Sequence, residues 1–201
     1  MGDRLRAARL ARGLSLRAIA RRLGVSPSLI SQVETSRANP SVSTLYALAS
    51  ELGISIDELL FVDAGATSEL PVTVAETGAS GERLPHDPVQ RASDRVRIRL
   101  GSGVAWERLT TESLRTVEFL FVTYEVGGAS SPADAFQRHK GIEWGYVLSG
   151  SLRVNIGFDE YRLGPGDAVT FDSAVPHRLS NDGPDLVTAV WFVLGRQSAD
   201  A

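Results

Sequence analysis

The apolar residues of the chain change their spacing between its first sixty residues and its last hundred. In the first part they recur every three or four positions, as in LRAIARRL at 16–23, which is the period of a helix with one buried side. From about Ser93 they alternate with polar residues, and turns containing Gly or Asp separate the short runs. This switch predicts an α+β protein of two domains, in which an all-helical domain is followed by an antiparallel β-barrel.

Three segments follow from this change of pattern. Residues 1–61 contain five predicted helices, at 3–12, 16–23, 27–36, 42–52 and after the capping box that begins at Ser55. Residues 62–92 are rich in Gly, Pro, Ser and Thr, and we interpret them as a linker with one short strand at 70–75. Residues 93–196 contain the predicted strands, at 96–100, 117–126, 144–148, 152–156, 161–163, 168–171, 177–179 and 186–194.

Charge divides the chain in the same place. Residues 1–61 hold eight arginines and five acidic residues, a net charge of +3, whereas the remainder holds 13 basic and 19 acidic residues, a net charge of −6. A basic front domain favours a polyanionic partner. The chain has no cysteine, which excludes disulfides and thiolate metal sites. It has no apolar run near the ~20 residues that span a bilayer and no signal-peptide pattern, so we expect a cytoplasmic protein without a membrane partner.

A helix, a tight turn at Gly24-Val25 and a second helix opened by Ser26-Pro27 form the plan of a helix-turn-helix motif. Residues 3–60 contain "LGVS", "IS..E" and "TL..LA..LG.S.DELL", and they closely resemble the XRE family, the lambda/434-repressor type of DNA-binding domain. One departure is Ser36, where many relatives have glycine. The resemblance implies that the helix beginning at Pro27 enters the major groove of double-stranded DNA.

Eight residues of this unit are predicted to contact a DNA operator. Gln32 is the best candidate for reading a base, because its amide can pair with adenine at two points, and Ser28 is the second candidate. Arg17, Arg37 and Asn39 are placed to contact phosphate, as are the free N–H groups at the helix starts. The full set is Arg17, Ser26, Pro27, Ser28, Ser31, Gln32, Arg37 and Asn39.

Residues 129–181 resemble the cupin family, which folds as a double-stranded β-helix. The first cupin motif has the general form G-x5-H-x-H-x3or4-E-x6-G, and His139, Glu143 and Gly150 fit it, while Gln137 stands in the place of the first His. The second motif is usually G-x5-P-x-G-x2-H-x3-N. Gly166, His177 and Asn181 fit the second motif, whereas Asp172 and Ala174 stand where Pro and Gly are usual.

The resemblance implies a metal held by His139, Glu143 and His177, with Gln137 as a further weak ligand. Four residues along a straight strand span ~13 Å, so His139 and Glu143 can converge only if the chain turns at Lys140-Gly141. Two imidazoles and one carboxylate leave open coordination positions, which suits a divalent ion such as Fe, and Zn or Mn as well. The alternative is a pocket without metal, in which His139 and Glu143 hydrogen-bond each other.

An effector pocket is expected around the same side chains. Alternation along the strand that contains Glu143 turns Gly145 and Val147 inward and Trp144 and Tyr146 outward. The predicted pocket residues are Gln137, His139, Glu143, Phe171 and His177, and Trp191 and Arg99 are further candidates that could equally be ordinary packing or surface residues.

Two functions are compatible with this plan. The first is a homodimeric transcriptional regulator, in which the cupin domain binds a small-molecule effector, with or without a metal, and modulates operator binding. The second is a non-haem metal-dependent enzyme, because hydroxypropylphosphonate epoxidases resemble the chain in joining a helix-turn-helix domain to a cupin. The polar recognition face and the many arginines of the first domain favour the regulator, so we predict that the chain is not an enzyme.

Overall fold

The computed structural model describes residues 1–54, 56, 59, 88–111 and 117–195. Four helices come first: α1 (Gly2–Ala11), α2 (Leu16–Leu23), α3 (Pro27–Glu34) and α4 (Val42–Leu52). A short 3-10 helix, η1 (Ala92–Asp94), precedes nine strands. The strands are β1 (Arg97–Leu100), β2 (Val104–Arg108), β3 (Val117–Tyr124), β4 (Ile142–Ser149), β5 (Leu152–Ile156), β6 (Asp159–Leu163), β7 (Ala168–Asp172), β8 (His177–Ser180) and β9 (Val187–Leu194).

Helices α2 and α4 have the predicted bounds, whereas α1 is shifted by one residue and α3 ends two residues earlier than predicted. Ser15, Ser26 and Ser41 are the N-caps of α2, α3 and α4, and each side chain accepts a hydrogen bond from a backbone N–H of the first turn. Gly24 and Gly53 end α2 and α4 in the left-handed conformation that glycine adopts without strain. The fifth predicted helix and the strand at 70–75 lie mostly or entirely outside the described residues. Among the described helices, none has the length and apolar character needed to cross a membrane.

One buried ion pair ties the first helix to the third. The Arg9 Nε lies 2.6 Å from the Glu34 Oε1 and the Arg9 Nη2 lies 2.9 Å from the Glu34 Oε2, so the contact has two hydrogen bonds. Arg9 also donates from Nη1 to the Leu14 carbonyl at 2.6 Å. Both charged side chains are buried, at 8% and 6% exposure, beside a core that includes Ile30 and Val33. The sequence analysis counted these two residues only as charges and missed the pair.

The strands form two antiparallel sheets. The larger has the order β1-β2-β3-β9-β4-β7 and the smaller has the order β6-β5-β8. Inward-facing apolar side chains of the two sheets belong to one core, including Val147, Trp191, Leu152 and Leu179. Single bridges, such as Gln137 with His177, lie outside the named strands. The two sheets agree with the antiparallel prediction, but they do not confirm a closed barrel.

The sequence analysis missed β2. This strand forms a hairpin with β1 in which Leu100 pairs with Val104 across a turn at 101–103. Three consecutive residues of β2, from Val104 to Trp106, are buried, so the strand lacks the alternation that identified its neighbours. The signal that could have found it is the turn sequence Gly-Ser-Gly directly after the alternating run.

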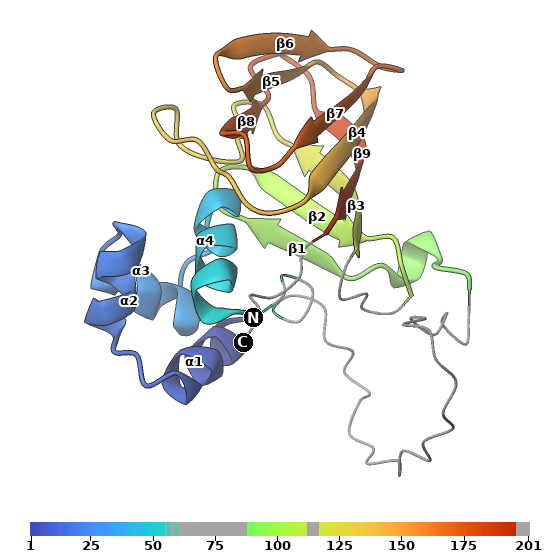
Figure 1. Ribbon diagram of the computed structural model, residues 1–201. Helices are drawn as coiled ribbons and strands as arrows, with labels where there is room; N and C mark the ends of the chain where they lie inside the picture. The colour runs from blue at the N-terminus through green and yellow to red at the C-terminus, as the bar shows by residue number, and fades with distance from the viewer. Residues whose placement is uncertain (55, 57–58, 60–87, 112–116, 196–201) are drawn as a thin grey trace, which may run out of the picture.

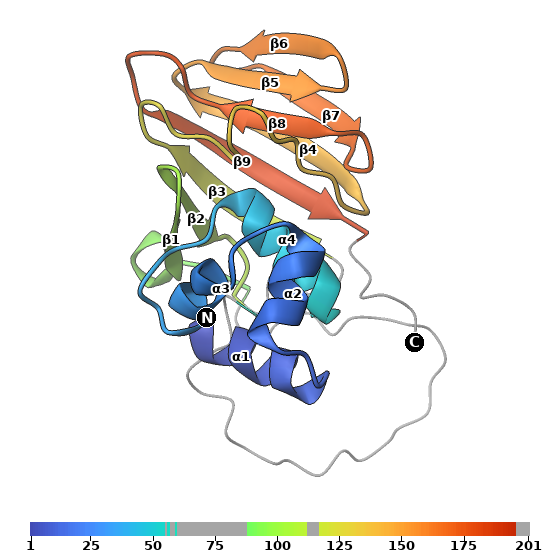
Figure 2. The ribbon, with the colours of Figure 1, turned by 90° about the vertical axis from the view of Figure 1, so that its left-hand side faces the viewer.

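Helix α4 is the part of the helical domain that contacts the sheets. It lies between α2 and the strands in Figure 1, and the hairpin of β5 and β6 lies farthest from the helices in both views (Figures 1 and 2). The Ser43 N–H donates to the Ser130 carbonyl at 3.0 Å, and the Gly101 N–H donates to the Pro40 carbonyl at 2.8 Å. A Cβ at Gly101 would lie 2.8 Å from the Asn39 carbonyl oxygen, so glycine permits this close approach.

Candidate functional site

The predicted DNA-contacting residues lie on α2, on α3 and in the segment after α3. Ser31 is half-buried, and the other seven are exposed: Arg17, Ser26, Pro27, Ser28, Gln32, Arg37 and Asn39. The apolar side of α3 packs in the core, since Ile30 and Val33 are 1% and 0% exposed. The first turn of α3 therefore presents its backbone N–H groups and short polar side chains to solvent, and one of those N–H groups is capped by Ser26.

The segment after α3 turns sharply at Ser36. Its φ is 55°, a left-handed conformation that favours glycine, and this position is the departure from the XRE pattern. The Arg37 and Ala38 N–H groups both donate to the Gln32 carbonyl, at 2.8 and 3.2 Å. This turn fixes the direction in which Arg37 leaves the recognition helix.

Three side chains of the β domain converge on one carboxylate oxygen. The His139 Nε2 lies 2.9 Å from the Glu143 Oε1, and the His177 Nε2 lies 3.2 Å from the same oxygen. All three side chains are buried, at 6%, 4% and 0% exposure for His139, Glu143 and His177. Their ligand atoms lie within 4.8 Å of one another, so residues 38 positions apart in the sequence meet in a group that could hold a metal ion.

The other ring nitrogens decide what these three atoms can do. The His139 Nδ1 lies 3.2 Å from the Lys140 carbonyl oxygen, and the His177 Nδ1 lies 2.9 Å from the Val175 carbonyl oxygen. A carbonyl oxygen only accepts, so each Nδ1 carries the proton. In a neutral ring the Nε2 then carries a lone pair and no proton. The His139 Nε2, the His177 Nε2 and the Glu143 Oε1 would be three acceptors in contact with one another. Such a cluster needs a cation, either protons on the two rings or a metal ion between the three atoms.

The measured separations fit a metal. Two ligands bound at about 2.1 Å and at right angles lie about 3.0 Å apart, close to the two contacts of the Glu143 Oε1. The Gln137 Nε2 lies 3.1 Å from the His177 Nε2, and the Gln137 Oε1 is buried without a hydrogen-bond partner among the described residues. The donor set of two imidazoles and one carboxylate therefore fits a divalent ion, with Gln137 beside it.

A turn and two glycines shape the cluster. Gly141 has a φ of 121°, and the predicted turn between His139 and Glu143 is confirmed at this residue. On β4, Glu143, Gly145 and Val147 are buried while Tyr146 is exposed, as alternation predicts. A Cβ at Gly145 would lie 2.1 Å from the Trp191 ring, so only glycine admits that ring at this position. The Trp191 Nε1 donates to the Glu143 Oε2 at 2.7 Å and thereby orients the carboxylate.

Burial and hydrogen bonds act in opposite directions on Glu143. Burial by itself raises the pKa of this carboxyl group, because it penalises the charged form. When both rings are protonated, the hydrogen bonds and the positive charge of His139 and His177 outweigh burial and hold the pKa of Glu143 below its usual range. Burial also raises the pKa of the nearby Tyr124 hydroxyl, and the negative charge of Glu143 raises it further. Glu143 is thus an ionised, buried carboxylate beside a neutral phenol.

Next to the cluster lies a cavity of about 20 Å³. This volume admits little more than one water molecule or one ion. Aromatic and apolar side chains form most of the wall, and Glu143 and Gln137 supply polar groups. The lining residues are Val42, Tyr46, Trp106, Leu120, Val122, Tyr124, Gln137, Glu143, Leu179 and Trp191.

The cavity corrects part of the predicted pocket. Phe171 does not line it but packs against the His177 ring, with ring centroids 4.9 Å apart. His139 and His177 lie behind Glu143 rather than on the cavity wall. Trp191 lines the cavity as suggested, whereas Arg99 is exposed on β1. Phe171 pairs with Glu143 across β4 and β7, so its ring lies beside the cluster and against His177 rather than on the cavity wall.

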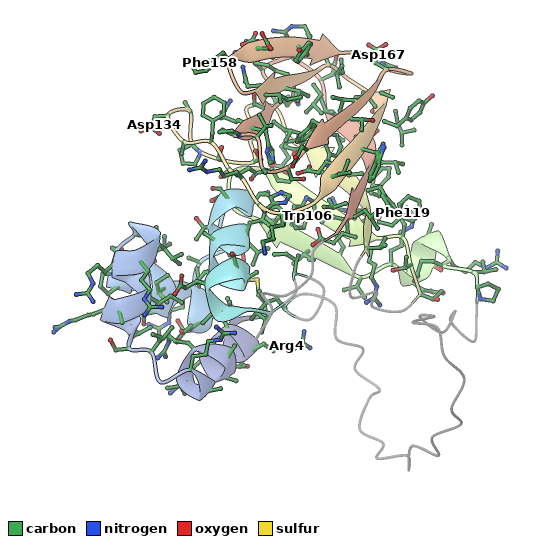
Figure 3. The ribbon with its side chains drawn as sticks, in the orientation of Figure 1. Arg4, Trp106, Phe119, Asp134, Phe158 and Asp167 are labelled. Carbon is green, nitrogen blue, oxygen red and sulfur yellow. The ribbon has the colours of Figure 1, made fainter. Side chains whose placement is uncertain are left out.

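Sequence reasoning missed the wall that comes from outside the cupin motifs. Trp106 comes from β2, the strand that was not predicted, and it lies where α4 meets the strands (Figure 3). Tyr46 and Val42 come from α4 of the helical domain. Helical spacing predicts that both residues lie on a buried face of the helix. The sequence does not indicate that this face packs against the cavity of the cupin domain.

Comparisons with known proteins agree with both halves of this structure. A model of the HTH_3 family, described as helix-turn-helix, matches residues 5–59, and a model of the Cupin_2 family, described as cupin domain, matches residues 120–193. The Escherichia coli transcriptional regulator PuuR is 28% identical over 182 residues, which cover 90% of this chain and 86% of PuuR.

Solved structures are similar in fold. An HTH_3-family transcriptional regulator from Vibrio cholerae has a TM-score of 0.62 at 20% identity and covers 96% of this chain and 93% of its own. Hydroxypropylphosphonic acid epoxidase from S. wedmorenis has a TM-score of 0.47 at 20% identity, covering 96% of each chain, and this likeness carries no argument about activity.

Fold and matches together define a class of protein in which a helix-turn-helix domain is joined to a cupin domain. Over 90% of its length the chain is similar in sequence to the helix-turn-helix-type transcriptional regulator PuuR.

Proposed function

We propose that the protein binds an operator through α3 and that its cupin domain binds a divalent metal ion and a small-molecule effector that modulates operator binding. One observation carries this proposal. A capped helix-turn-helix with a polar, exposed α3 is joined to a domain whose buried His139, Glu143 and His177 surround a cation-binding position.

The proposed DNA contacts divide into two kinds. Gln32 reads a base edge in the major groove with its amide, and Ser28 reads a second position. Arg17, Arg37 and Asn39 contact phosphates, as do the free N–H groups at the start of α3 beside Ser26. Pro27 and Ser31 add further contacts from the recognition helix. Phosphate contacts release counterions, so affinity falls steeply with salt for every sequence, whereas Gln32 sets the preference for one sequence.

The proposed metal site uses residues that are already oriented. His139, Glu143 and His177 would bind the ion, and Gln137 would be a weak ligand or an effector contact. A bound divalent ion such as Fe, Zn or Mn would supply positive charge and open coordination positions for electron-rich groups of the effector. Trp191 keeps the second oxygen of Glu143 engaged, so the carboxylate would present one oxygen to the ion.

A homodimer is proposed because the larger sheet has an apolar outer face. Phe119 pairs with Phe192 on the neighbouring strand, with ring centroids 6.0 Å apart, and Trp144 packs on Phe192 at 5.6 Å. Ile142 and Tyr146 continue this surface and are 44% and 46% exposed. We call these five residues the outer sheet face. A second copy that covers it would give a dimer with two α3 helices, and such dimers read pseudo-palindromes whose half-sites lie about one DNA turn, ~34 Å, apart.

The second candidate function is a non-haem metal-dependent enzyme, favoured by the His139–Glu143–His177 cluster with its open coordination positions. Against it stands the polar exposed face of α3, which has no role in an enzyme that does not bind DNA.

Metal analysis followed by DNA binding tests both candidates. The purified protein is analysed for bound metal, and its binding to random and selected duplexes is titrated at several salt concentrations with and without a chelator. We expect sequence-specific binding whose logarithm falls linearly with the logarithm of salt concentration. A protein that contains metal but prefers no DNA sequence would favour the enzyme.

A further inference from the structure

Tyr46 lies on α4 of the helix-turn-helix domain, but its side chain lines the cavity of the cupin domain. It lies in the middle of α4, yet it is only 7% exposed because residues of the β domain surround it. Its ring lies 4.4 Å from the His139 ring and 5.7 Å from the Trp106 ring. Its hydroxyl donates to the buried Glu118 Oε2 at 3.1 Å. Tyr46 therefore packs directly on a residue of the proposed metal site.

Helix α4 closes the cavity on that side. Val42, one turn before Tyr46, lines the same cavity and is 2% exposed. With both side chains in place about 20 Å³ remains, which is too small for an organic molecule of five or more heavy atoms. Most of the other lining side chains lie on paired strands, so movement of α4 with Tyr46 is the way to enlarge the cavity that leaves the sheets intact.

Besides the shared apolar core, hydrogen bonds around the cavity join α4 and the segment before it to the β domain. Those among the described residues include the Ser43 N–H to the Ser130 carbonyl, the Gly101 N–H to the Pro40 carbonyl, and the Tyr46 hydroxyl to Glu118. Because α4 also packs with α1 and α2 in one core, lifting it moves the whole helix-turn-helix domain relative to the sheets.

We propose that α4 is a lid on the cupin cavity, so that docking of the helix-turn-helix domain on the β domain and occupancy of the cavity by an organic molecule exclude each other. This inference rests on the proposed function for its biological meaning, since it supplies the route from effector to operator. By thermodynamic linkage, any change that weakens docking opens the cavity, and any organic occupant weakens docking by the same factor. A metal ion alone fits beneath the lid and leaves α4 in place.

Acrylamide is a suitable probe, because it is a small uncharged organic molecule that quenches tryptophan on contact. Trp106 and Trp191 line the cavity and are 4% and 5% exposed. In a Trp144→Phe background, which removes the tryptophan on the outer sheet face, quenching reports entry into the cavity. Hydrogen exchange of the Ser43 N–H reports docking independently, since this N–H bonds across the two domains.

Two variants weaken docking without replacing a tryptophan. Gly101→Ala places a Cβ 2.8 Å from the Asn39 carbonyl oxygen, outside the cavity. Tyr46→Phe keeps the ring and removes the hydrogen bond to Glu118. Gly183→Ala is the matched control, because its Cβ would meet its nearest neighbour at an ordinary 3.5 Å.

Each of the two variants is expected to raise the acrylamide quenching constant and the exchange rate of the Ser43 N–H together, by about fivefold or more. The control should change neither quantity. Faster exchange with unchanged quenching, or unchanged quenching in both variants, would overturn the lid. Neither measurement uses DNA or metal, so the lid can fail while operator binding stands, and operator binding can fail while the lid stands.

Discussion

The two domains place their polar groups in opposite ways. The helix-turn-helix domain spends its apolar residues on a small core and displays Ser28, Gln32 and Arg37 to solvent. The cupin domain buries Gln137, Glu143 and His177 at 6%, 3% and 0% exposure and leaves its apolar outer sheet face partly exposed. Polar groups on a surface stay hydrated, so they cost little folding free energy and are available to bind a partner. Buried polar groups must instead be satisfied by each other, by a cation or by a ligand.

The helical domain also has one buried charge pair, and breaking it should give the largest effect. Glu34→Ala leaves Arg9 buried without its two-point partner, so we expect a loss of about 3–5 kcal/mol in the free energy of unfolding. Urea denaturation followed by circular dichroism measures it. Arg22→Ala removes an exposed pair with Glu51 and should cost no more than about 1 kcal/mol. Similar losses for both variants would mean that burial of the first pair is unimportant.

Substitutions in the cluster of His139, Glu143 and His177 should change metal affinity more than the stability of the fold. Glu143→Gln removes the negative charge of the carboxylate that both His139 and His177 approach, and metal affinity should fall by about 100-fold or more. Titration with Zn²⁺ in a calorimeter measures the change. Glu160→Gln, on the exposed surface of β6, is the control and should bind as the wild type does. Wild-type affinity in Glu143→Gln would refute the proposed ligand set.

A substitution on the outer sheet face should weaken the homodimer. Phe192→Lys places a charge among Phe119 and Trp144, so we expect the dimer to dissociate at least about tenfold more readily. Sedimentation equilibrium gives the dissociation constant. Tyr161→Lys makes the same replacement at an exposed aromatic residue on the smaller sheet, 47% exposed, and should leave the assembly unchanged. If the wild type is a monomer, the dimer proposal is wrong.

The smallest effect is expected at the turn after α3, where a substitution should increase the stability of the protein. Ser36→Gly relieves a left-handed conformation with a φ of 55° and should stabilise the protein by about 0.5–1 kcal/mol. Ser50→Gly makes the same replacement at an exposed position inside α4, where glycine should instead cost about 0.5–1 kcal/mol. Thermal unfolding of the pair measures both signs, and a shared sign would contradict the backbone explanation.

The same contrast explains what the sequence could predict. Caps such as Ser26 and stops such as Gly24 act within one or two turns, so the helices and the exposed face of α3 were predictable from short segments. The strand containing Glu143 was predictable from alternation, and the turn at Gly141 from the need to bring two ligands together.

The remainder depended on contacts between distant segments. The Trp191 ring fits only because Gly145 on the neighbouring strand lacks a side chain, and strand pairing is not written in either segment alone. Tyr46 looked like an ordinary residue of an amphipathic helix, yet it covers a cavity of the other domain. Phe171 was one candidate for the pocket, and the pairing of β7 with β4 sets it opposite Glu143 with its ring against His177.

The central claim is that this protein reads a DNA sequence with α3. Selection of binding sites from a random duplex library, for the wild type and for Gln32→Ala, tests it most directly. We predict that the wild type enriches a pseudo-palindrome with half-sites about one helical turn apart. Gln32→Ala should lose about 1–3 kcal/mol of discrimination at one position of each half-site while retaining its salt-dependent affinity. Enrichment of no sequence by the wild type, or of an unchanged sequence by Gln32→Ala, would contradict the claim.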